Sequence, residues 1–86
     1  MHLGEVIKTR RTFRRLSLEK LSVVTGYTVS TLKDIEANNS KPVIYGDIAR
    51  GVLENKDIEV YNGYFKFCRL ADALGFDPLE LEQIAK

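Results

Sequence analysis

Cysteine is nearly absent from this chain of 86 residues, which contains only Cys68. A single cysteine cannot form a disulfide within the chain, and this fits a reducing compartment. Long apolar runs are absent too: none approaches the roughly 20 residues that span a bilayer. Charges recur from Glu5 onward, where a secretory signal would be apolar. We therefore expect a cytoplasmic protein that makes no contact with a membrane.

Residue types that carry catalysis or bind metals are scarce or scattered. His2 is the only histidine, and Cys68 falls on the apolar face of a predicted helix, which is typical of a core position. The sequence has neither a glycine-rich phosphate loop nor a cluster with metal-ligand spacing. We therefore expect no enzymatic activity, no catalytic residue, no metal site and no cofactor.

Charge is distributed unevenly along a chain long enough for one domain, residues 1–86. Residues 1–41 hold eight basic and four acidic residues, a net charge of +4, whereas residues 42–86 hold five basic and eight acidic residues, a net charge of −3. This asymmetry is typical of a protein with a face that binds a polyanion such as nucleic acid. Chance clustering on a solvated surface is the alternative.

Helical spacing and capping residues predict two helices near the start of the chain. Apolar residues recur at helical spacing over residues 3–14, with basic residues between them. Ser17 is a suitable N-cap for a second helix over residues 18–25. That helix is expected to stop at Gly26, because glycine readily adopts the left-handed backbone of a helix end.

A third helix, over residues 28–36, follows after one tight turn. We expect Leu21, Val24 and Leu32 to pack together across this turn. Two short helices joined in this way over residues 17–37 form a helix-turn-helix unit. The polar face of its second helix would then point outward, where it fits a major groove about 12 Å wide.

The segment 43–61 gives the weakest pattern in the chain. Asp47 is a suitable cap for a short helix, which we favour slightly. Two short strands, at residues 52–53 and 58–61, fit the composition as an alternative. Apolar spacing then predicts C-terminal helices over residues 62–85.

The order and spacing of these pieces resemble the phage lambda-repressor, Cro and Xre family of helix-turn-helix DNA-binding domains. The matching pieces are Leu16–Ser22, Gly26–Thr28 and Ser30–Glu36. Leu70–Leu81 resembles the family's fourth and fifth helices. The resemblance implies an all-α, five-helix domain. Here that domain carries an insertion at about 43–61, a short helix or β-hairpin, between the third and fourth helices.

Base-contacting residues follow from the resemblance, which places them at the start of the recognition helix: Thr28, Val29, Ser30, Lys33 and Asp34. Their chemistry agrees, because Val29 can touch a thymine methyl group and Asp34 can accept from a cytosine amino group. The alternative is that Thr28 is only an N-cap and Asp34 only a solvated acid.

Phosphate contacts are expected from cationic, amide and hydroxyl side chains around the same helix: Arg10, Arg14, Asn38, Asn39, Ser40 and Lys41. A solvated basic surface is the alternative for the two arginines. The resemblance also implies a structural ion pair between Arg11 and Glu36, which would tie the first helix to the recognition helix.

Three features depart from the family pattern. Leu18 stands where many relatives carry Gln at the front of the second helix, so a common phosphate contact is absent. Arg15 stands where relatives usually carry Gly or Asn, which either strains or alters the turn before the second helix. The third departure is the insertion at about 43–61. Aromatic residues within or beside it are more typical of a core or an interface than of base stacking: Tyr45, Tyr61, Tyr64 and Phe65.

Together these features predict a sequence-specific transcriptional regulator, in the role of a repressor, that binds double-stranded DNA. One recognition helix covers few base pairs, so we expect a homodimer on a short palindromic operator. The alternative is a protein-interaction module, such as an antitoxin or an antirepressor, that binds a partner protein through residues 43–61 and the acidic C-terminal half.

Overall fold

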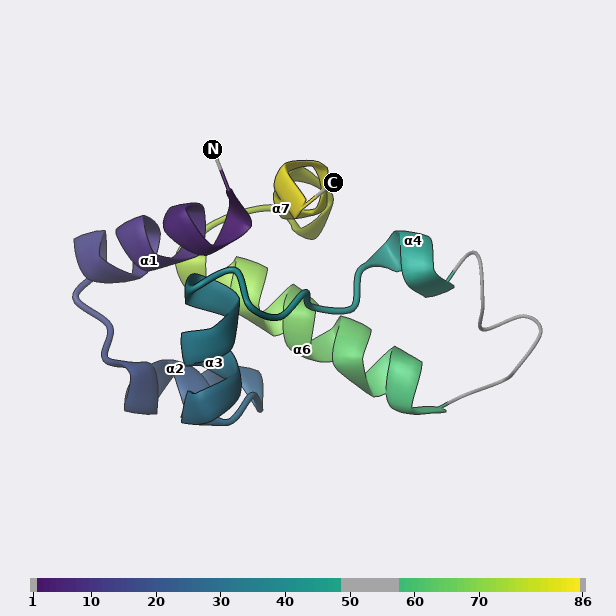
Figure 1. Ribbon diagram of the computed structural model, residues 1–86, viewed down its shortest axis with the longest axis horizontal. Helices are drawn as coiled ribbons and strands as arrows, with labels where there is room; N and C mark the ends of the chain where they lie inside the picture. Colours follow the sequence, from purple (N-terminus) through teal and green to yellow (C-terminus); the bar gives the residue numbers. More distant parts are fainter. Residues whose placement is uncertain (1, 49–57, 86) are drawn as a thin grey trace.

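The computed structural model describes residues 2–48 and 58–85, and over these residues every regular element is a helix (Figure 1). The described part of the chain is therefore all-α, as expected. In chain order the helices are α1 (Leu3–Phe13), α2 (Leu18–Thr25), α3 (Val29–Glu36), α4 (Tyr45–Asp47), α6 (Ile58–Leu74) and α7 (Pro78–Ala85).

Local capping residues determine where α2 and α3 begin. The Ser17 hydroxyl accepts a hydrogen bond from the Lys20 N–H at 3.0 Å, and the Thr28 hydroxyl accepts one from the Thr31 N–H at 3.1 Å. Gly26, with φ of 88°, ends α2 in the left-handed conformation. The predicted start and end of α2 and the predicted start of α3 are thus confirmed.

Like α2, three other helices end with a left-handed residue that turns the chain away from the helix axis. These residues are Arg15 after α1, Asn38 after α3 and Gly75 after α6. At the carboxyl end of α3, the Asn39 N–H donates to the Asp34 carbonyl at 2.8 Å. The Asn38 N–H donates to the Ile35 carbonyl at 3.1 Å. Such Schellman bonds occupy carbonyls that have no partner within the helix.

The main core lies where α1, α2, α3 and α6 meet. Its fully or almost fully buried side chains are Ile7, Leu21, Tyr27, Leu32, Ile35, Leu70 and Leu74. Val24 was expected there, but 43% of it is exposed, so that expectation was wrong. The buried face of α2 runs instead through Leu21 and Thr25, which lie four residues apart.

Gly4 brings the start of α1 into direct contact with the end of α3. A Cβ atom at this position would lie only 2.5 Å from the Ile35 carbonyl oxygen, so no larger residue fits without a shift. The Gly4 N–H donates to the Asn38 side-chain oxygen at 2.9 Å. The Asn38 side-chain amide therefore caps the start of α1 and fixes α1 against the end of α3.

The second half of the chain departs from the predicted boundaries. Helix α6 begins at Ile58 rather than near residue 62, so the strand proposed for residues 58–61 is wrong: these residues form its first turn. A helical pattern of aromatic residues continues from Tyr61 into the rest of α6, and this favours one long helix. The rest of the region in which a short helix or hairpin was expected, residues 49–57, lies outside the described residues.

Candidate nucleic-acid interface

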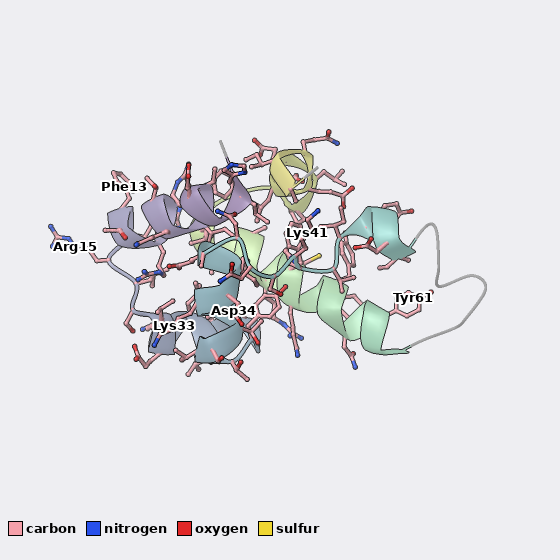
Figure 2. The ribbon with its side chains drawn as sticks, viewed as in Figure 1. Phe13, Arg15, Lys33, Asp34, Lys41 and Tyr61 are labelled. Atoms are coloured by element: carbon pink, nitrogen blue, oxygen red, sulfur yellow. The ribbon has the colours of Figure 1, made fainter. Side chains whose placement is uncertain are left out.

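Helix α3 has a buried apolar face and an exposed polar face. Leu32 and Ile35 are 0% and 2% exposed, and they hold the helix against the core. Ser30, Lys33 and Asp34 are exposed, with the last two labelled on α3 in Figure 2. The two faces follow from the sequence because residues three apart share a face of a helix.

The first turn of α3 brings the remaining predicted base-contacting residues beside these three. Thr28 is exposed, and its hydroxyl donates to the Thr31 hydroxyl at 2.8 Å while accepting the capping bond. Val29 is half-buried. Thr28 thus acts as an N-cap and also lies on the surface, so its cap role does not remove it from the site.

Arg11 and Glu36 form a nearly buried ion pair between α1 and α3. The Arg11 Nε lies 2.7 Å from the Glu36 Oε2, and the Arg11 Nη2 donates to the Glu36 Oε1 at 3.2 Å. The Arg11 Nη1 donates to the Leu16 carbonyl at 2.9 Å. The guanidinium therefore joins three segments at once, and the two-pronged bond to Glu36 sets the orientation of α3.

Arg10 and Arg14 reach away from α3 to the carboxyl end of α6. The Arg10 Nη1 donates to the Leu74 carbonyl at 3.1 Å, and its guanidinium carbon lies 4.4 Å from the centre of the Phe76 ring. The Arg14 Nη1 donates to the Ala73 carbonyl at 3.2 Å. Cations are stabilising at the carboxyl end of a helix. Both arginines thus have a structural role that sequence reasoning missed, and their phosphate contacts stay a prediction.

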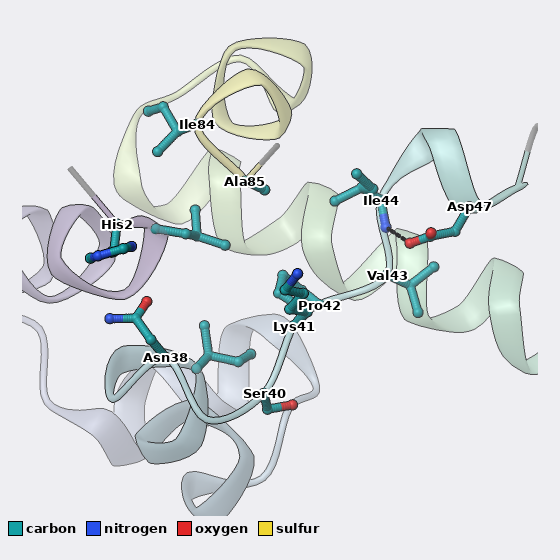
Figure 3. A pocket seen from close by; sticks show the side chains of 12 residues that line it. His2, Asn38, Ser40, Lys41, Pro42, Val43, Ile44, Asp47, Ile84 and Ala85 are labelled. Atoms are coloured by element: carbon teal, nitrogen blue, oxygen red, sulfur yellow. Dashed lines mark hydrogen bonds between the residues drawn. The ribbon is translucent and has the colours of Figure 1, made fainter.

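The loop after α3 presents Asn39, Ser40 and Lys41 as exposed residues. The side-chain oxygen of Asn38 already has a structural partner, because it accepts the hydrogen bond that caps α1. Behind the loop lies a groove of about 790 Å³, shown in Figure 3, with His2 at one end and Ile84 on its far side. Of the predicted phosphate contacts, Asn39, Ser40 and Lys41 therefore lie on the surface next to the end of α3.

Comparisons with known protein families, with characterised proteins and with solved structures give no match. The interpretation of the site consequently rests on its own geometry. Within residues 2–48 and 58–85, no cluster of His, Cys, Asp and Glu side chains is arranged to hold a metal ion. In the same part of the chain, no helix has the length and apolar character needed to cross a membrane.

Tyr27 fixes the turn between α2 and α3 from inside the core. It is 7% exposed, and burial, with a smaller contribution from Cys68, raises the pKa of its hydroxyl. Its backbone N–H donates to the Thr25 hydroxyl at 3.2 Å, and its carbonyl accepts from the Ser22 hydroxyl. Because side chains of α2 satisfy this backbone, the turn has little freedom to change its angle.

Tyr64 links α6 to the region around α4. A hydrogen bond with the Cys68 side chain, followed by partial burial and nearby groups that include Glu82, raises the pKa of Tyr64 to about 12. Its ring meets the Tyr45 ring edge to face, with the centroids 5.9 Å apart. Tyr64 is therefore neutral at physiological pH and ties α4 to α6.

Proposed function

We propose that the protein is a sequence-specific DNA-binding transcriptional regulator in which α2 and α3 form a helix-turn-helix. The observation that carries this proposal is the exposed polar face of α3, which stands opposite two fully buried apolar residues. A rigid helix with a free polar face is what major-groove recognition requires. The resemblance to lambda-repressor, Cro and Xre domains supports the same assignment, with α4 and the start of α6 belonging to an inserted segment.

The proposal gives each part of the surface a role. Ser30, Lys33 and Asp34 contact base edges, and Thr28 and Val29 contact the neighbouring base or sugar. Phosphate is bound beside them by Asn39, Ser40 and Lys41, and the remaining predicted phosphate contacts come from Arg10, Arg14 and Asn38. The pair of Arg11 and Glu36 touches no DNA and acts by holding α3 at a fixed angle.

Palindromic operator binding by a dimer follows from the size of α3. The helix has eight residues, and a single helix of this kind reads only a few base pairs. Two copies on half-sites one or more helical turns apart double the sequence that is read. Occupation of such a site near a promoter would make the protein a repressor.

The test is selection of bound sequences from a random DNA pool, followed by fluorescence anisotropy on the selected site. We expect a palindromic consensus. The affinity should fall steeply with salt, with a log–log slope of about −4 to −5 per subunit if roughly 4–6 phosphates are contacted. An unenriched pool together with a flat salt response would overturn the proposal.

A matched pair of variants locates the reading surface. Asp34→Ala should weaken binding to the selected site by roughly 10-fold to 100-fold, because a base contact is lost, and leave binding to random DNA at least as strong. Asp72→Ala removes an acid that is also exposed, on α6, and should change neither affinity. Equal effects of the two substitutions would show that α3 does not read the bases.

The second candidate function is a protein-interaction module, such as an antitoxin or an antirepressor. The exposed aromatic residues on α4 and α6 favour it, because such residues are enriched at protein interfaces. This alternative would be supported if the purified chain bound no sequence from the random DNA pool but co-purified with one other protein.

A further inference from the structure

Two basic side chains of α6, those of Lys66 and Arg69, lie across the turn that precedes α3. A Cβ atom at Gly26, the left-handed end of α2, would lie 3.6 Å from the Arg69 Nη1. The same atom would lie 3.6 Å from the Lys66 Cγ and 3.7 Å from its Cε. Thr28, the N-cap of α3, comes two residues after Gly26. These two residues, which we call the α6 cations, therefore lie beside the amino end of the proposed recognition helix.

The position of the α6 cations follows from the apolar pattern of their helix. Phe67 and Leu70 are fully buried, and each directly follows one of the two basic residues. Because Lys66 and Arg69 are three residues apart, they share one side of α6. This side meets the end of α2, against which α6 packs. The net charge of −3 over residues 42–86 gives no sign of this local concentration of positive charge.

Neither of the α6 cations has an acidic partner. Within residues 2–48 and 58–85, the one ion pair is that of Arg11 with Glu36, and neither α6 cation donates a hydrogen bond to the protein. Arg69 is exposed and Lys66 is half-buried. Asp72 lines a shallow cleft together with Arg69 but lies one helical turn farther from Gly26 and is not paired with it. Both charges are therefore available to an external anion.

Packing accounts for the length of these side chains but not for their charge. The methylene groups of a lysine or an arginine can cover neighbouring surface while the charged end stays in water. The stem of Lys66 covers Gly26 in this way, which explains why Lys66 is half-buried. An uncharged side chain of similar length would cover the turn equally well. The positive charges consequently call for a different explanation.

We propose that Lys66 and Arg69 bind the phosphate backbone of DNA beside the amino end of α3. A guanidinium can hold a phosphate through two parallel hydrogen bonds, and a lysine binds phosphate as a point charge. The inference rests on the proposed DNA-binding function and adds two residues of the acidic half of the chain to the surface that contacts DNA.

The α6 cations complete a set of phosphate contacts at both ends of α3. This helix has eight residues and is therefore about 12 Å long. Ser40 and Lys41 follow its carboxyl end, whereas the α6 cations lie at its amino end. The two groups thus meet different phosphates. Contacts to the backbone fix the register and orientation of a protein on the duplex, so contacts at both ends would hold α3 in place while its polar face reads the bases.

The first test measures affinity against salt by fluorescence anisotropy on the selected site and on random DNA. Lys66→Gln and Arg69→Gln should each weaken binding to both by about 5-fold to 10-fold at 0.1 M salt. Each should also lower the magnitude of the log–log slope by about 0.9, because one phosphate contact is lost. Lys66→Arg and Arg69→Lys are the matched controls: they keep the charge and should keep the wild-type slope. Circular dichroism spectra that match the wild type show that each variant is folded.

A second experiment distinguishes a direct contact from a long-range effect of charge. Each phosphate of the selected site is replaced in turn by an uncharged methylphosphonate. At one phosphate, the replacement should weaken binding of the wild type by about 5-fold to 10-fold and that of Lys66→Gln by less than about 2-fold, because the contact is already lost. Lys41→Gln should lose its sensitivity at a different phosphate. Identical responses of the wild type and both α6 variants at every phosphate would overturn the inference.

The two kinds of DNA separate this inference from the proposed function. If both glutamine variants bind the selected site with the wild-type affinity and slope, the inference alone is overturned. If no sequence is enriched, but the chain binds random DNA and both variants weaken that binding, sequence-specific regulation alone is overturned. If the wild-type chain binds no DNA at all, both are overturned.

Discussion

Arg15 adopts a backbone conformation that arginine normally avoids. Its φ of 56° places it in the left-handed region, where the Cβ of an L-residue crowds the following carbonyl oxygen. The conformation persists because the Arg15 N–H donates to the Thr12 carbonyl and the Leu16 N–H donates to the Arg11 carbonyl, both at 3.0 Å. The sequence left open whether the turn would be strained or altered, and the structure shows that it is strained.

Arg15→Gly should therefore stabilise the protein by about 0.5–1 kcal/mol, because the strain is relieved and only part of the gain is offset by the greater freedom of glycine in the unfolded chain. Urea unfolding at neutral pH measures this change. Asn38→Gly is the informative comparison: φ is 61° there too, but the Asn38 side chain bonds the Gly4 N–H. That variant should gain nothing or lose stability. A destabilised Arg15→Gly protein would contradict the assignment of strain.

At the scale of helices, local signals were sufficient for the first part of the chain. Ser17 and Gly26 are adjacent in sequence to the helix whose limits they set, so the bounds of α2 were predictable. The hydrogen-bond partners of Arg10 and Arg14 were not predictable, because these partners lie 64 and 59 residues away in the chain. The sequence shows that these cations are available, but only the packing of α1 against α6 decides which carbonyls they meet.

The ion pair between α1 and α3 should behave as one unit in a double-mutant cycle. Glu36→Ala and Arg11→Ala should each destabilise the protein by about 2–4 kcal/mol, because the side chains are 8% and 15% exposed and the partner left behind is nearly buried. The double variant should recover about 1–3 kcal/mol of the summed loss. Urea unfolding of all four proteins provides the measurement, and simple additivity would show that the pair is not coupled.

At the scale of the whole molecule, contacts between distant segments place the region that the sequence left ambiguous. Gly63 in α6 allows Val43 to approach so closely that a Cβ atom there would lie 2.9 Å from the Val43 Cγ2. The Glu82 carboxylate, on the last helix, accepts a hydrogen bond from the Tyr45 N–H at the start of α4. Neither contact has a local sequence signal, because the residues that meet are far apart in the chain: Tyr45 and Glu82 are separated by 37 residues.

Glu82 is 4% exposed, and its hydrogen bond to the Tyr45 N–H makes the last helix part of the support for the segment before residue 49. Glu82→Ala should cost about 1–3 kcal/mol, because the Tyr45 N–H loses its acceptor in a partly buried place. The amide hydrogen of Tyr45 should then exchange faster, which NMR can follow for that residue alone.

Two control variants complete this test. Glu82→Gln keeps an oxygen acceptor and should restore most of the protection of the Tyr45 amide. Gln83→Ala, at the exposed neighbouring position, should change stability by less than about 0.5 kcal/mol. If Tyr45 exchange were the same in all four proteins, α4 would have to be held by packing against α6 alone.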